Sequence, residues 1–103
     1  MKQRPAPPSE YDVQASQHAL AFALSRLENE REVLAFLRDL CTPAELEAMS
    51  DRWRVVPLLR KGVPYREIHE LTQVSVTTIG RVARFLVAGN GGYQTALKRL
   101  APL

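Results

Sequence analysis

The segment from Pro64 to Leu86 contains two short helical patterns separated by a turn, and this spacing constrains the fold of the whole chain. Pro64 suits the first turn of a helix, where its missing N–H costs nothing. Ile68 and Leu71 are expected to give that helix one buried side. Ser75 is a favourable N-cap for the second helix. Spacings of three and four residues predict its buried face, formed by Val76, Ile79, Val82, Ala83 and Leu86.

The opposite face of the second helix carries small polar and arginine side chains. Thr77, Arg81 and Arg84 lie four and three residues apart, so they point away from the apolar face. Because the major groove accepts a helix of this kind, residues 64–86 are predicted to form a DNA-reading helix-turn-helix. Gly80 lies inside this helix, where glycine costs about 1 kcal/mol relative to alanine. Its presence indicates the close approach of another surface, either DNA or a packed helix.

The two halves of the chain differ in charge. Residues 1–51 hold five Lys and Arg against nine Asp and Glu, whereas residues 52–103 hold nine against two, a net charge of +7. DNA binding depends on neutralising phosphates, and the basic half contains the predicted helix-turn-helix. The distribution favours a double-stranded DNA partner, although a solvated basic face gives the same pattern.

The rest of the chain shows four further helical patterns and no strand alternation. Residues 1–8 are proline-rich, which predicts a disordered tail, and residues 9–103 are expected to form a single all-helical domain. The further helices are expected over residues 9–27, 29–41, 43–61 and 93–100. Residues 87–93 should form a flexible loop. The predicted anchors of the last helix are Ala96, Leu97 and Leu100.

The helix over residues 43–61 has explicit signals at both ends. Thr42 and Glu45 form a capping box around Pro43 at the first helical position, and Gly62 provides the stop. Pro57 removes one backbone hydrogen bond, which predicts a kink or break. The expected core face consists of Leu46, Met49, Trp53, Val56 and Leu58 or Leu59.

The first helix has an apolar surface too broad for one neighbouring helix to cover. That surface consists of Tyr11, Val13, Ala19, Leu20, Phe22, Ala23 and Leu24. Because a monomer of 103 residues has a thin core, we expect burial against a second copy of the chain.

The sequence contains no arrangement of residues typical of a catalytic or metal site, so neither an enzyme nor a cofactor is expected. His18 and His69 are about fifty residues apart, and no metal-ligand spacing relates them to Cys41. The glycines of residues 89–92 precede no Lys-Ser/Thr pair and follow no strand. A single cysteine and the lack of a long apolar run predict a cytoplasmic or nucleoid-associated protein.

The segment from Leu40 to Arg84 resembles the Trp repressor family. The likeness rests on LCTPAELEAMSDRWRVVPLLRKG, with Arg52 and Arg54 as an Arg-x-Arg pair, followed by YREIHEL and TTIGRV. The later AGNGGYQTALKRL looks like the Trp-repressor-related branch. The resemblance implies an intertwined all-helical homodimer whose two helix-turn-helix heads bind consecutive major grooves of a palindromic operator.

The resemblance also implies positions for DNA contacts. They are Arg66, His69, Val76, Thr77, Thr78 and Gly80, with Arg54 as a phosphate clamp. His69 stands where the family has a lysine, so one charge contact differs.

A corepressor pocket is implied as well, at Thr42, Arg52 and Arg81, with the two arginines stacking on an aromatic ring. Val82 replaces a small glycine of the family, and Phe85 replaces a serine. The added bulk predicts that L-tryptophan is not the corepressor, or binds far more weakly, and leaves open whether another small molecule is the effector.

The leading hypothesis is therefore a homodimeric transcriptional regulator. One alternative is a protein-interaction or structural module with a solvated basic face. The other is a DNA-targeting accessory subunit of a recombinase or nuclease. Salt-dependent DNA binding distinguishes the first alternative, and a palindromic site upstream of a gene distinguishes the second.

Overall fold

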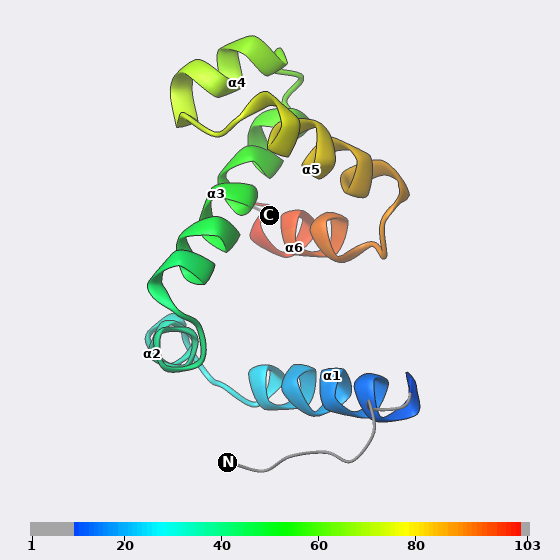
Figure 1. Ribbon diagram of the computed structural model, residues 1–103. Helices are drawn as coiled ribbons and strands as arrows, with labels where there is room; N and C mark the ends of the chain where they lie inside the picture. Colours follow the sequence, from blue (N-terminus) through cyan, green and yellow to red (C-terminus); the bar gives the residue numbers. More distant parts are fainter. Residues whose placement is uncertain (1–9, 102–103) are drawn as a thin grey trace. The chain divides into compact units, whose positions relative to one another are not determined.

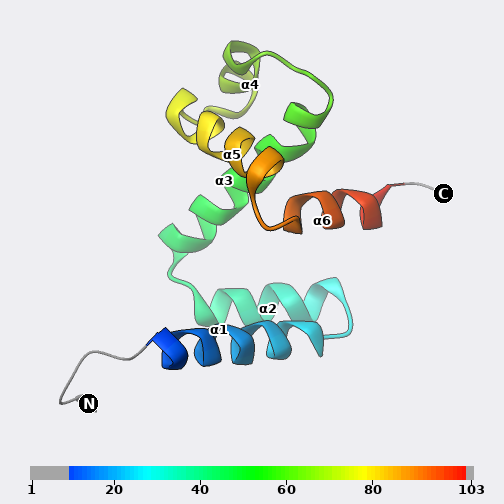
Figure 2. The ribbon, with the colours of Figure 1, turned by 90° about the vertical axis from the view of Figure 1, so that its right-hand side faces the viewer.

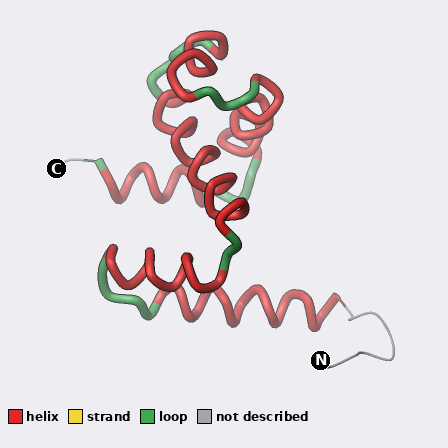
Figure 3. Tube along the Cα trace, turned by 60° about the vertical axis from the view of Figure 1, so that its left-hand side comes forward, coloured by secondary structure: helices red, strands yellow, loops and turns green. Residues whose placement is uncertain are grey.

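A computed structural model describes residues 10–101, which form six α-helices and no strand (Figure 1). The predicted all-α fold class is confirmed, and Figure 3 shows how short the loops between helices are. The helices are α1 (Glu10–Ser25), α2 (Glu30–Leu40), α3 (Pro43–Arg60), α4 (Tyr65–Thr72), α5 (Val76–Ala88) and α6 (Gly92–Leu100). The predicted tail, residues 1–8, and the expected helix start at Ser9 lie outside the described residues.

The helices form two compact units, the first containing α1 and α2 and the second α3 to α6. In the first unit, Asn29 caps α2 because its Oδ1 accepts a hydrogen bond from the Glu32 N–H at 2.9 Å. The described side chains of this unit, residues 12–40, include none that is buried. Its exposed large apolar side chains are Val13, Leu20, Phe22, Leu34 and Leu40. The single domain expected for residues 9–103 stays a prediction.

In the second unit, α3 begins and ends where its sequence signals indicate. The Thr42 hydroxyl accepts from the Glu45 N–H at 3.1 Å, and the Glu45 carboxylate accepts from the Thr42 N–H at 2.8 Å. This reciprocal pair is the predicted capping box, with Pro43 in the first turn. Gly62 follows the helix with a φ of +82°, a conformation that glycine adopts without steric cost.

Pro57 does not break α3, so that part of the prediction is wrong: the helix continues to Arg60. Proline removes only its own donor, and the last turn keeps the hydrogen bond from the Lys61 N–H to the Pro57 carbonyl at 3.1 Å. The preceding residues Val55 and Val56 are fully buried, which holds this part of the helix in place.

The core of the second unit lies where α3, α4 and α5 meet. These three helices pack against one another, and α6 packs against α5 (Figure 2). The buried apolar side chains are Val55, Val56, Ile68, Val74, Ile79, Val82 and Leu97. The helix-turn-helix predicted at 64–86 is present with small shifts, since α4 begins after Pro64 and α5 continues through Val87 to Ala88.

Four apolar side chains that the spacing placed in the core are exposed instead. They are Met49 (40%), Leu71 (60%), Val76 (52%) and Leu100 (69%). In the eight-residue α4, the buried side is Ile68 and Thr72, four residues apart, and Leu71 lies about 100° away from Thr72. Val76 is the first residue of α5, one turn before Ile79, where burial begins.

Candidate DNA-binding site

Side-chain hydrogen bonds close the turn between α4 and α5. Gln73 ends α4 in the left-handed conformation, with a φ of +65°. The Thr72 hydroxyl donates to the Ile68 carbonyl at 2.7 Å and accepts from the Val74 N–H at 3.1 Å. His69 Nδ1 lies 2.7 Å from the Val74 carbonyl, which can only accept, so Nδ1 carries a proton. The turn is thus fixed from both sides, by a buried hydroxyl and by an imidazole.

Arg54 reaches this turn from α3. Its Nη1 donates to the Thr72 carbonyl at 3.4 Å and lies 3.7 Å from Asp51 Oδ1. The Arg54 side chain is half exposed, and a guanidinium has five N–H donors, so further donors face outward beside the turn. A phosphate placed there would meet a cation that is already tied to the helix-turn-helix.

The first turn of α5 is capped by Ser75 and presents its other side chains outward. The Ser75 hydroxyl accepts from the Thr78 N–H at 3.1 Å and donates to the Thr78 hydroxyl at 3.0 Å. Val76 and Thr77 are exposed. A Cβ added to Gly80 would meet nothing within 4 Å, so packing among the described residues does not require this glycine. The predicted approach of a surface outside the chain stays a prediction.

The seven residues predicted to contact DNA lie on three helices of the second unit. Arg54 and His69 converge on the turn through hydrogen bonds. Arg66 is exposed on the first turn of α4. The other four predicted contact residues lie in the first two turns of α5: Val76, Thr77, Thr78 and Gly80. Thr72, which joins these groups, was not singled out in the sequence because its role depends on a buried hydroxyl.

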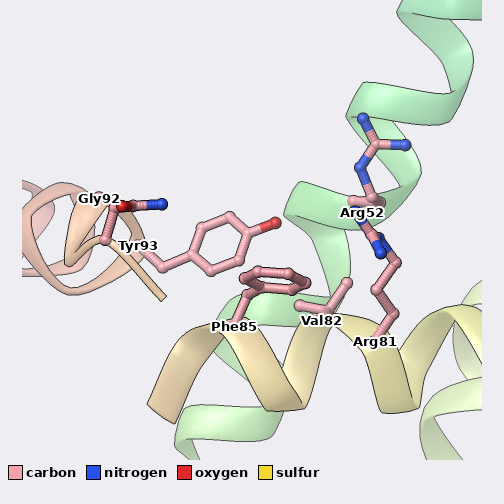
Figure 4. A pocket seen from close by; sticks show the side chains of 7 residues that line it. Arg52, Arg81, Val82, Phe85, Gly92 and Tyr93 are labelled. Carbon is pink, nitrogen blue, oxygen red and sulfur yellow. The ribbon is translucent and has the colours of Figure 1, made fainter. Parts of the chain in front are cut away.

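A pocket of about 380 Å³ lies on the other side of α5, and Figure 4 shows the side chains around it. It is lined by Arg52, Arg81, Val82, Phe85, Asn90, Gly92 and Tyr93. Four of the five predicted pocket residues are therefore brought together. Thr42 is not among the lining residues; it is the N-cap of α3, ten residues before Arg52.

Three lining residues escaped the sequence prediction: Asn90, Gly92 and Tyr93, which come from the loop after α5 and the start of α6. The sequence signal that could have found them is the glycine-rich stretch before the last helix. A Cβ on Gly89 would clash with the Phe85 backbone oxygen, and Gly91 has a φ of +84°. These glycines let the chain turn sharply, which places Tyr93 beside Trp53, with ring centroids 6.4 Å apart.

Phe85 supplies an aromatic ring to the pocket from within the chain. The Arg81 guanidinium carbon lies 4.9 Å from the centroid of this ring, a cation–π distance. Figure 4 shows the Phe85 ring beside Val82 and Tyr93. Val82 lines the pocket beside this ring and also belongs to the buried core, since it is only 1% exposed.

Two negative findings concern the described residues 10–101. None of their helices is long and apolar enough to cross a membrane. No three His, Cys, Asp or Glu side chains among them gather where a metal ion could be held.

Comparison with known proteins shows the family. The family model described as Trp repressor protein matches residues 15–101, which include all four helices of the second unit. The chain belongs to the Trp repressor family. This fold is a regulatory DNA-binding fold and not an enzymatic one, so the prediction that the chain is not an enzyme is confirmed at family level.

Three relatives of this Trp repressor family member illustrate the likeness. It is 39% identical over 74 residues to the uncharacterized protein YerC of Bacillus subtilis (strain 168), covering 72% of this chain and 71% of YerC. A crystal structure of a candidate Trp repressor from Staphylococcus aureus is 33% identical, with a TM-score of 0.79, covering 90% of this chain and 95% of that one. The structure of a TrpR like protein from Eubacterium eligens ATCC 27750 is 35% identical, with a TM-score of 0.70, covering 89% and 90%.

Proposed function

We propose that this Trp repressor family member is a sequence-specific transcriptional regulator that binds a palindromic operator as a homodimer. The observation that carries the proposal is the two-sided character of α5. On one side of the helix Ile79 and Val82 are buried in the core, whereas Val76 and Thr77 on its first turn are exposed. In a helix-turn-helix the N-terminal residues of the second helix contact base edges, so the exposed turn is the one that reads DNA.

The charged groups around this turn fit the phosphate backbone. Arg54 and Arg66 lie on α3 and α4, in the half of the chain with a net charge of +7. We assign both arginines to phosphates, which position the helix without reading sequence. His69 uses Nδ1 on the Val74 carbonyl, so its Nε2 can donate to a phosphate only when the ring carries both protons. Thr77 and Thr78 are assigned to base edges, and Gly80 to close approach of the helix.

The homodimer rests on apolar side chains that the single chain leaves uncovered. None of the described side chains of α1 and α2 is buried, and five large apolar ones are exposed. Covering the exposed parts of these five side chains is worth on the order of 4–7 kcal/mol. A second copy offers the same surface by symmetry, and in that dimer residues 9–103 would form one domain.

L-tryptophan is not the effector in this proposal. Phe85 already places a ring against Arg81, and Val82 fills space beside it. Overpacking such a site costs about 1–3 kcal/mol, a factor of about 5 to 150 in affinity. The arginine that would stack on a ligand is thus engaged by the chain itself, and α5 is held without a corepressor.

The test is selection of bound sequences from a random double-stranded DNA pool with the purified full chain, followed by sedimentation of the free protein. We expect a two-fold symmetric motif with half-sites about 34 Å apart, and a dimer at micromolar concentration. Equal affinity for selected and random DNA, or a monomer at that concentration, would contradict the proposal. Because the proposed partner is chromosomal DNA, the protein is assigned to the cytoplasm.

A further inference from the structure

The first turn of the reading helix α5 offers methyl groups where many DNA-binding helices offer amides or guanidiniums. Val76 is 52% exposed, and the neighbouring Thr77 is also exposed. The Ser75 hydroxyl is used by the helix cap, since it accepts from the Thr78 N–H and donates to the Thr78 hydroxyl, which keeps only its own O–H as a donor. Gly80 has no side chain, so this turn presents mainly the isopropyl group of Val76 and the side chain of Thr77.

The hydrogen-bonding side chains on either side of this turn are directed elsewhere. Gln73, in the preceding turn, donates from Nε2 to the Glu70 carbonyl at 3.2 Å. The guanidinium carbons of Arg81 and Arg84 lie 4.9 and 5.9 Å from the Phe85 ring centroid. Both arginines therefore stack on an aromatic ring of their own helix, one to two turns beyond Val76. Bidentate recognition of guanine or adenine is not available from the first turn.

We propose that Val76, assisted by the methyl group of Thr77, reads the C5-methyl group of thymine in the major groove. This inference rests on the proposed function and names what the reading helix recognises. Thymine is the one DNA base with a methyl group on its major-groove edge, and apolar contact with that methyl distinguishes it from cytosine. The open space around Gly80 lets the helix backbone approach closely enough for a short side chain to reach the base.

Deoxyuridine substitution tests the contact directly, because it removes the thymine methyl group and leaves the hydrogen-bonding edge unchanged. The operator obtained by selection is resynthesised with single thymines replaced by deoxyuridine, and its affinity for the purified protein is measured. We expect one position in each half-site at which the loss is about fourfold, which is ~0.8 kcal/mol at 1.4 kcal/mol per tenfold change. Substituting both half-sites should give about sixteenfold.

A double-mutant cycle assigns this loss to one side chain. In Val76→Ala the same deoxyuridine substitution should have almost no further effect, since the contact is already gone. Val87→Ala is the matched control, because Val87 is a valine at the other end of α5 and is 87% exposed. The control variant should show the same deoxyuridine penalty as the unmodified protein. Circular dichroism would verify that both variants are folded.

The outcomes separate this inference from the function on which it rests. If the protein prefers operator DNA over random DNA but no deoxyuridine substitution weakens binding, the proposed methyl contact is wrong. The proposal of a sequence-specific regulator then still holds. An unchanged deoxyuridine penalty in Val76→Ala also overturns the assignment to this residue. If no sequence is preferred over random DNA, both proposals fail together.

Discussion

Replacing Gly80 with alanine should move protein stability and DNA affinity in opposite directions. The new Cβ would meet nothing within 4 Å of the described chain, so the folded state gains no steric strain. Glycine in a helix interior is less favourable than alanine by about 0.5–1 kcal/mol, chiefly because it loses more backbone freedom on folding. Gly80→Ala should therefore raise the melting temperature by about 2–8 °C.

The same methyl group would stand on the surface that we propose faces DNA. A helix seated closely in the groove has no room for an added methyl, and overpacking costs about 1–3 kcal/mol. Affinity for the operator should fall by a factor of about 5 to 150. Thermal unfolding followed by circular dichroism measures the first effect, and equilibrium titration of labelled operator measures the second.

Gly92→Ala is the control, since Gly92 also lies in a helix with nothing within 4 Å of its added Cβ. Because Gly92 is the first residue of α6 and not an interior one, stability should change less than in Gly80→Ala. DNA affinity should stay the same, because α6 carries none of the proposed contacts. A Gly80→Ala protein that binds the operator as tightly as the unmodified protein would refute the reasoning. Lower stability in Gly80→Ala would instead show that the glycine serves packing that the single chain does not reveal.

Three further predictions follow from the turn and the pocket. Thr72→Val should destabilise the protein by about 1–3 kcal/mol in denaturant unfolding, because the buried Val74 N–H loses its acceptor, and Thr72→Ser should restore most of the loss. Arg54→Ala should weaken binding to all DNA and lower the salt slope by about one, whereas Thr77→Ala should cost about 1–3 kcal/mol at particular base pairs; equal losses on operator and random DNA would contradict this. Calorimetry with L-tryptophan should show no micromolar binding by the unmodified protein, and tighter binding by a Val82→Gly/Phe85→Ser variant.

Features that depend on residues close in sequence were predictable. The capping box between Thr42 and Glu45, the cap at Ser75 and the stop at Gly62 each involve at most four consecutive residues. Such signals act through local backbone hydrogen bonds and conformational preference, so their spacing is visible in the sequence. The position of the helix-turn-helix followed from them together with the periodicity of α5.

Features that depend on how helices pack were not predictable in the same way. Arg54 bonds to a carbonyl 18 residues away, and Tyr93 enters the pocket because α6 packs against α5. Periodicity marks a helix face as apolar but does not say how much of it a neighbour covers. For this reason Leu71 and Val76 were placed in the core, while the residue of α4 that is buried together with Ile68 is Thr72.

The exposed apolar residues of this chain therefore carry two different kinds of information. Phe22 and Leu40 lie in the first unit, in which none of the described side chains is buried. Several exposed apolar side chains would have to be covered together there, as a second copy of the chain would do. Val76 stands singly among polar neighbours on the first turn of α5, where a protein partner would also have to cover Ser75 and Thr77. The floor of the DNA major groove presents the thymine methyl group among hydrogen-bonding base edges. It therefore matches one valine among polar side chains better than an apolar protein surface does. We therefore assign the isolated Val76 to the proposed base contact and the exposed apolar side chains of the first unit to the proposed subunit contact.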